Sequence, residues 1–221
     1  MGRVHASEAP ASFIMQGLID FLVSAHSVAQ ELRKHLIFNV VPVLNPDGVF
    51  LGNTSGNLLG QDLNRCWNNP NPFSHPTVHS LRELILKSDK DPNNTLDMVI
   101  DIHSHISLLG LFIVGNSYDD VYRFERHVVF PKIMAQVCPD FSWDNTIYND
   151  DESKAGTARR YLCDSLSPEV NSYTLEVSLY GYVDPSSDAL LPVVVPYTDD
   201  MYCRIGRNLA RALWDYYKIL K

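Results

Sequence analysis

The sequence lacks several features that would assign it to a special class of protein. No uncharged apolar run approaches the roughly 18–20 residues that a membrane span needs. Internal repeats and low-complexity tracts are also missing. Cysteine is scarce, and no two cysteines form a Cys-x-x-Cys pair, so we expect free thiols and a reducing compartment rather than a disulfide framework or zinc knuckle. The four cysteines are Cys66, Cys138, Cys163 and Cys203.

Positive charge is the second shortage. The 221 residues include 26 Asp and Glu against 18 Lys and Arg, which gives a formal net charge of −8. Broad nucleic-acid binding relies on clustered Lys and Arg, so we expect no nucleic-acid partner and no membrane partner. The phosphate-binding pattern GxxxxGK[ST] is absent, and no glycine is followed by lysine. Nucleotide binding is therefore not expected either.

The composition that is present is globular, with 45% hydrophobic residues and a length that suits one domain. Apolar spacing predicts helices alternating with strands. This order indicates an α/β fold whose mixed, mostly parallel sheet carries helices on both faces. The predicted helices cover 11–35, 76–87, 118–137, 153–166 and 198–220, the predicted strands cover 36–43, 96–102, 111–114 and 172–179, and residues 45–48 are predicted to turn.

Polar residues that packing does not require lie beside three of these elements. Residues 5–8 (HASE) precede the first helix, residues 101–105 (DIHSH) close a strand, and Glu176 lies inside the apolar strand SYTLEVSL. Sites in open α/β sheets form at the carboxyl ends of strands. Two imidazoles and one carboxylate are the donor set of a catalytic zinc, and a further carboxylate can act as its general base. His5, Glu8 and His103 suit the ligands, and Glu176 suits the base.

Each of these residues also has an ordinary structural explanation when it is taken alone. The pattern HxxE occurs by chance, His103 suits a hydrogen-bonded strand end, and Glu176 suits a buried structural acid. His75 and His79 stand one helical turn apart and offer a second metal pair, although a solvated helix face explains such a pair more often. Only the combination of His5, Glu8, His103 and Glu176 is specific.

Seven segments, in the same order along nearly the whole chain, resemble the zinc metallocarboxypeptidases. Within that family they are most similar to the cytosolic carboxypeptidases, also called ATP/GTP-binding-protein-like proteins, and especially to the sixth type. The segments are RVHASEAPAS, VPVLNPDGVFLGN, GQDLNRCW, HPTVHSL, DIHSH, KAGTARRYL and SYTLEVSLYGY. The resemblance implies the metallocarboxypeptidase fold, a bound Zn²⁺ and the removal of residues from peptide carboxyl termini.

The resemblance also implies roles at the metal site. His5, Glu8 and His103 match the zinc ligands, and Glu176 matches the general base and acid. His105 stays an alternative third ligand, because residues two apart on a strand share one face.

Three further residues match substrate-binding positions. Asn64 and Arg65 of DLNR resemble the pair that holds the carboxyl terminus of the substrate, since a guanidinium binds a carboxylate bidentately. Arg159 matches a basic residue that favours acidic side chains, with Lys154 and Arg160 as further candidates. The implied activity is the removal of glutamates from polyglutamylated tails such as those of tubulin. The implied location is the cytosol, including microtubules or centrioles.

The chain departs from the family pattern at two places. Residues 5–8 read HASE where the family has HPGE, and Ser55 stands where the family has an arginine that stabilises the oxyanion. Loss of one oxyanion donor typically reduces the rate by about 10²–10³. The alternative function is therefore a catalytically impaired module that binds glutamylated tails. A small N-acyl-amino-acid amidohydrolase is a third possibility, against which the DLNR motif argues.

The family's N-terminal β domain and the first strands of its catalytic sheet have no counterpart in residues 1–221. We therefore expect one partial catalytic domain over this range.

Overall fold

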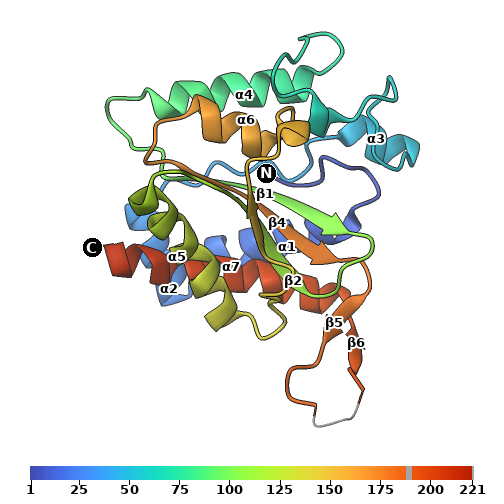
Figure 1. Ribbon diagram of the computed structural model, residues 1–221, viewed down its shortest axis with the longest axis vertical. Coiled ribbons are helices and arrows are strands. Elements are labelled where there is room, and N and C mark those ends of the chain that lie inside the picture. The colour runs from blue at the N-terminus through green and yellow to red at the C-terminus, as the bar shows by residue number, and fades with distance from the viewer. Residues whose placement is uncertain (188–190, 221) are drawn as a thin grey trace.

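The computed structural model, which describes residues 1–187 and 191–220, has three layers (Figure 1). A central sheet separates two groups of helices, and this arrangement confirms the predicted α/β fold with helices on both faces. One face is covered by α4 (Pro76–Asp89) and α6 (Ala158–Ser165). The other face carries α1 (Ala9–Val23), α2 (Ser27–His35), α5 (Val121–Val137) and α7 (Asp199–Leu220).

The sheet contains four strands in the order β1-β4-β2-β3, namely β1 (Met98–His105), β4 (Asn171–Ser178), β2 (Leu111–Asn116) and β3 (Ile147–Asn149). The pairs β1–β4 and β2–β3 are parallel, whereas β2–β4 is antiparallel, so the sheet is mixed as expected. A separate hairpin, β5 (Gly181–Val183) with β6 (Val194–Pro196), extends from one end of the sheet (Figure 1). Its three-residue strands are too short to leave a readable pattern in the sequence.

Strand alternation decides which residues face the site. Tyr173, Leu175 and Val177 of β4 lie in the core against α1, α5 and α7. Because successive strand residues point to opposite faces, Glu176 faces the other way. Ile102 of β1 lies in the same core, so His103 also faces the opposite side of the sheet. The register places His103 beside Glu176 across the β1–β4 ladder.

Two predicted features near the N-terminus are wrong. The helix predicted over 11–35 is two helices, α1 and α2, bent by 89° at the break between them. His26 begins the second helix because its Nδ1 accepts the Val28 N–H. The turn predicted over 45–48 instead begins the short helix α3 (Pro46–Leu51), since the Asn45 side chain accepts the Gly48 N–H.

The buried strand predicted over 36–43 is also wrong. The segment has half-buried and exposed side chains, and Ile37 is 72% exposed. A strand needs a neighbouring backbone to complete its ladder. Among the described residues only Gly2 supplies one, because its N–H donates to Val41 O and its carbonyl accepts the Leu44 N–H. Within the described residues, 36–40 have no such neighbour, so apolar character alone does not make them a strand.

The other predicted elements are present, with their ends shifted by a few residues. The helix predicted over 153–166 is divided into a short 3₁₀ turn, η2 (Glu152–Lys154), and α6. In the part of the chain that the structure describes, no single helix combines the length and the apolar character needed to cross a bilayer.

Helices α1 and α7 approach each other closely, and this packing depends on two glycines. A Cβ added at Gly206 would lie 2.0 Å from the Ile14 carbonyl oxygen, and one added at Gly17 would lie 2.0 Å from the Cys203 carbonyl oxygen. We expect Gly206→Ala to force the helices apart and to lower the unfolding free energy by about 1–3 kcal/mol or more in urea titrations. Arg207→Ala, at the next position and exposed, is the control, and a change of more than about 0.5 kcal/mol there would point to another cause.

Candidate active site and metal centre

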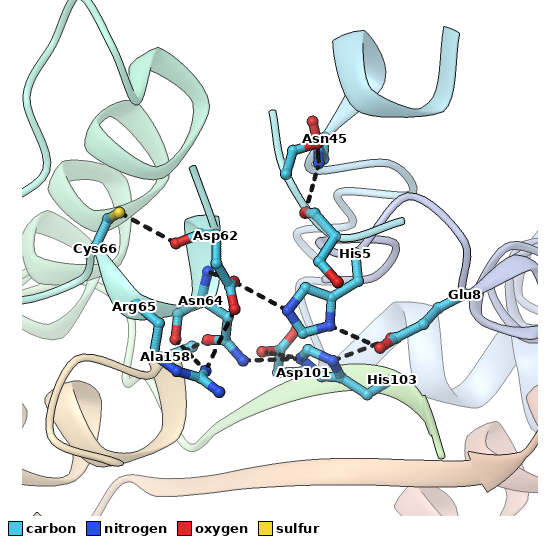
Figure 2. A network of polar contacts seen from close by, with 12 residues as sticks. His5, Glu8, Asn45, Asp62, Asn64, Arg65, Cys66, Asp101, His103 and Ala158 are labelled. Carbon is cyan, nitrogen blue, oxygen red and sulfur yellow. Dashed lines mark hydrogen bonds and ion pairs between the residues drawn. The ribbon is translucent and has the colours of Figure 1, made fainter. Parts of the chain in front are cut away.

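Three predicted ligands converge where α1 begins and β1 ends (Figure 2). His5 lies in the loop before α1, Glu8 is the N-cap residue of that helix, and His103 lies on β1. One donor atom of each lies within 4.8 Å of the others. The Glu8 carboxylate lies between the two imidazoles, with Oε1 at 2.6 Å from His5 Nδ1 and Oε2 at 3.1 Å from His103 Nδ1. The Ser104 N–H also donates to Glu8 Oε2.

Each imidazole is oriented by a carboxylate on its far side. His5 Nε2 lies 3.0 Å from Asp62 Oδ1, and His103 Nε2 lies 2.8 Å from Asp101 Oδ2. Metal-binding histidines usually present one ring nitrogen to the metal and donate the other N–H to a carboxylate. Here both Nδ1 atoms face Glu8. The orientation therefore fits a metal held by His5 Nδ1, His103 Nδ1 and the Glu8 carboxylate, which is the His₂Glu set of a catalytic zinc.

This geometry shifts the pKa values of the three donor groups. Burial opposes ionisation of all three groups, but their hydrogen bonds outweigh it. The pKa of Glu8 falls to about 2 because His103 and His5 bond to it, and the pKa of His5 rises to about 9 because Asp62 and Glu8 bond to it. The pKa of His103 rises well above its ordinary value beside Asp101. Without metal, both imidazoles are therefore protonated at neutral pH.

Zinc binding is consequently expected to release protons. The ion requires neutral imidazoles, so binding at pH 7 should displace about two protons from His5 and His103. The affinity for zinc should rise with pH up to about 9, where His5 titrates in the metal-free protein. Calorimetry in two buffers of different ionisation enthalpy measures this release. An affinity that is independent of pH between 6 and 9 would contradict the protonated cluster.

Glu176 lies next to this cluster on β4. It pairs in register with His103, and burial raises the pKa of its carboxyl to about 7. Its Oε2 is buried without a hydrogen-bond partner in the described residues. An acceptor in this position is available for a proton, which the predicted role as general base requires.

Asn64 and Arg65 lie in a 3₁₀ turn, η1 (Leu63–Arg65), beside the same cluster (Figure 2). The Arg65 guanidinium is half-exposed, donates to Asn64 O and stands 3.8 Å from Asp62 Oδ2. Asn64 is buried, its Oδ1 accepts the Ala158 N–H, and its Nδ2 lies 3.3 Å from His103 Nε2. Asp62 thus contacts both His5 and Arg65, and so links the metal ligands to the predicted carboxylate clamp.

Among the described residues, the Arg159 guanidinium forms no hydrogen bond or ion pair with this cluster. It is buried and donates to Gly115 O, Asn116 Oδ1 and both oxygens of Asn149. In the described part of the chain no carboxylate lies within 4.0 Å of it. Lys154 is exposed, and Arg160 stands 3.7 Å from Asp164. The role of the basic residues of GTARR in substrate binding stays a prediction.

The alternative metal positions are placed differently from the cluster. His105 Nδ1 accepts the Leu108 N–H, and the group of metal donors contains His103 instead. His75 is buried, with Nε2 at 2.9 Å from Gln61 Oε1. Within residues 1–187 and 191–220, neither His75 nor His79 belongs to a group that could hold a metal. The four cysteines are free, as expected.

Sequence reasoning missed Asp62 and Asp101. Asp101 could have been found, because it stands two residues before His103 and hence on the same face of the strand. Asp62 directly precedes Leu-Asn-Arg in the DLNR motif, but nothing in the linear sequence indicates that this loop returns to His5.

Comparisons with known proteins agree with this geometry. The zinc carboxypeptidase family model matches residues 1–193. Cytosolic carboxypeptidase 6 from Mus musculus is 48% identical over 218 residues, covering 99% of this chain and 40% of the relative, and the Homo sapiens protein is 47% identical, covering 99% and 42%. The chain spans about two-fifths of the length of these relatives.

Solved structures share the fold at lower identity. A metallo-carboxypeptidase from Burkholderia cenocepacia has a TM-score of 0.82 at 23% identity, covering 100% of this chain and 56% of its own. One from Pseudomonas aeruginosa has a TM-score of 0.78 at 21% identity, with coverage of 100% and 56%. The sequence match and the converging His, Glu and His donors lead to the same conclusion: the chain belongs to the zinc carboxypeptidase family.

Proposed function

We propose that this protein is a zinc-dependent carboxypeptidase that removes residues from the carboxyl termini of peptides. One observation carries the proposal: the three metal donors converge beside the buried carboxylate of Glu176, which has no partner at Oε2 among the described residues. A zinc ion at such a site polarises the scissile carbonyl and lowers the pKa of water. His5, Glu8 and His103 are the residues that would hold it.

Other side chains transfer the proton, bind the peptide carboxylate and orient the imidazoles. Glu176 accepts the proton of the attacking water and delivers it to the leaving amine, a transfer suited to a carboxyl whose pKa is about 7. The half-exposed Arg65 guanidinium binds the terminal carboxylate of the peptide bidentately. Asp62 and Asp101 hold the two imidazoles in the orientation that leaves Nδ1 for the metal.

The proposed substrates are polyglutamylated protein tails such as those of tubulin, acted on in the cytosol and at microtubules or centrioles. The names of the cytosolic relatives support the location. The Arg159 guanidinium is buried, and its hydrogen bonds go to neutral acceptors that do not cancel its positive charge. This charge lies near the turn that packs on Arg65, which supports a preference for acidic residues. Gly156 of that turn is so close that an added Cβ would lie 2.5 Å from Arg65 O.

The proposal is tested by mass spectrometry of a peptide that ends in several glutamates. We expect loss of one glutamate at a time, inhibition by a zinc chelator with recovery on added zinc, and no cleavage of the same peptide with an amidated carboxyl terminus. Equal cleavage of the amidated peptide would contradict a carboxypeptidase. Equal cleavage of a peptide ending in leucines would contradict the preference for glutamate.

The alternative function is a module that binds glutamylated tails and hardly hydrolyses them. Its support is Ser55, which stands at the position where the family has the arginine that stabilises the oxyanion. Ser55 is half-buried, and its carbonyl oxygen accepts a hydrogen bond from Asn45 Nδ2 at 3.4 Å. Its side chain is an uncharged hydroxyl, so it offers no fixed positive charge. Tight binding of the glutamate peptide without turnover, followed by turnover in Ser55→Arg, would favour this alternative.

A further inference from the structure

A row of three arginines occupies one face of α7. This helix packs on the face of the sheet opposite to the one that carries the candidate site residues of β1 and β4. Arg204, Arg207 and Arg211 recur three and four residues apart, so they are neighbours on one side of the helix. They line a groove of about 570 Å³ together with residues of α1, α2 and α5. Figure 1 shows α2 and α5 beside α7 in this layer.

Two of the three arginines have no carboxylate partner among the residues that the structure describes. Arg204 stands 3.9 Å from Asp140, whose side chain is buried, and this contact anchors one end of the row. Arg207 and Arg211 are exposed, and neither has a carboxylate within 4.0 Å in residues 1–187 and 191–220. Asp200 and Asp215 lie one turn beyond the two ends and form no ion pair with the row in that part of the chain. The row is thus a local positive surface on a chain of net charge −8.

The shape and lining of the groove indicate what it binds. Phe21, Val28 and Val137 line it and pack against the main core, which gives it an apolar floor beneath the guanidinium groups. From residue 204 to residue 211 the helix rises about 10.5 Å, at 1.5 Å per residue. An extended peptide covers this distance in about three residues. The row therefore spans about three residues of an extended chain, of which the first and the third present their side chains to the same face.

An acidic peptide matches these features better than a single-stranded nucleic acid does. Binding of single-stranded nucleic acid depends on exposed aromatic rings for base stacking, and the Phe21 ring is half-buried with its centroid 5.1 Å from that of His26. We propose that the α7 groove is a second binding surface, separate from the active site, for a short extended run of glutamate or aspartate residues.

The experiment measures fluorescence anisotropy of a labelled decaglutamate peptide with an amidated carboxyl terminus, added to the full chain. The amide removes the free terminal carboxylate, so the peptide does not engage a terminal-carboxylate clamp. We expect binding that weakens with salt and falls at least about tenfold in Arg207→Glu/Arg211→Glu. The matched control, Lys87→Glu/Lys90→Glu at the C-terminal end of α4, makes the same change in net charge on the opposite layer and should alter binding less than about twofold.

Three results would overturn the proposal. Equal loss in the α4 control would mean that only net charge matters, and absence of decaglutamate binding to the wild-type chain would remove the ligand class. Tighter binding of an oligothymidylate with the same dependence on Arg207 and Arg211 would assign the groove to nucleic acid. Glu176→Gln and zinc removal should leave decaglutamate binding unchanged, so failure of the proposed activity and failure of this surface are measured separately.

Discussion

Replacing Glu176 by glutamine is expected to reduce peptide hydrolysis by about 10³-fold or more, within the range that general base catalysis contributes. The amide has the same shape as the carboxyl but accepts no proton from water. Glu176 is not among the three metal donors, so zinc stoichiometry should be unchanged. Steady-state hydrolysis of a glutamate-ending peptide and metal analysis of the same preparation test both expectations.

Stability distinguishes this catalytic effect from damage to the fold. Burial raises the pKa of Glu176 to about 7, so in the metal-free protein its contribution to stability is present at low pH and is lost as pH rises through that value. The metal-free Gln variant should therefore be at least as stable as the wild-type protein at pH 8. A variant that keeps more than about a tenth of the activity, a loss far smaller than a missing general base causes, would remove Glu176 from the proposed mechanism.

The second large effect is expected for Asp101→Asn. The Asp101 carboxylate accepts the Nε2–H of His103, so Nδ1 is the nitrogen that gives up its proton when the metal binds. An asparagine that donates its amide N–H to Nε2 would move the proton to Nδ1, where it competes with zinc. We expect zinc affinity to fall by about 10- to 100-fold, the usual cost of losing such an outer carboxylate. Competition with a chelator of known affinity measures the change.

Asp62→Asn and Asp151→Asn complete this test. Asp62 likewise contacts the Nε2 atom of His5, but it is half-exposed and also contacts Arg65. Replacing Asp62 should therefore weaken zinc binding less than replacing Asp101 does. Asp151 is exposed in a loop, and its replacement should leave zinc affinity unchanged. If Asp101→Asn binds zinc as tightly as Asp151→Asn does, the geometry assigned to His103 is wrong.

The sequence predicts the metal donors better than their surroundings because the two depend on different ranges of contact. His5 and Glu8 are three residues apart at a helix start, and His103 lies near the end of a strand, so local pattern proposes them and the resemblance to the family selects His103 over His105. Asp62 approaches His5 from 57 positions away, through a loop whose path no local pattern describes. The role of such a residue emerges only when the chain is folded.

One other error has a physical cause of the same kind. Residues 36–43 are apolar enough for a strand, but strand formation needs a neighbour, and among the described residues Gly2 alone provides one. Arg159 lies in a motif that resembles a substrate site, and the structure adds that its guanidinium is buried among carbonyl and amide oxygens, while its role in substrate binding stays a prediction. Neither burial nor the availability of a partner can be inferred from residue type alone. The net charge of −8 likewise gives no indication of the basic row on α7.

Zinc stoichiometry tests the central claim most directly, namely that His5, Glu8 and His103 hold one metal ion. Metal analysis after dialysis against zinc should find about one ion per wild-type chain and far less in His5→Ala and His103→Ala. His79→Ala, a histidine outside the group of metal donors, should retain the full amount. Equal zinc in His79→Ala and His103→Ala, or none in the wild-type chain, would contradict the account.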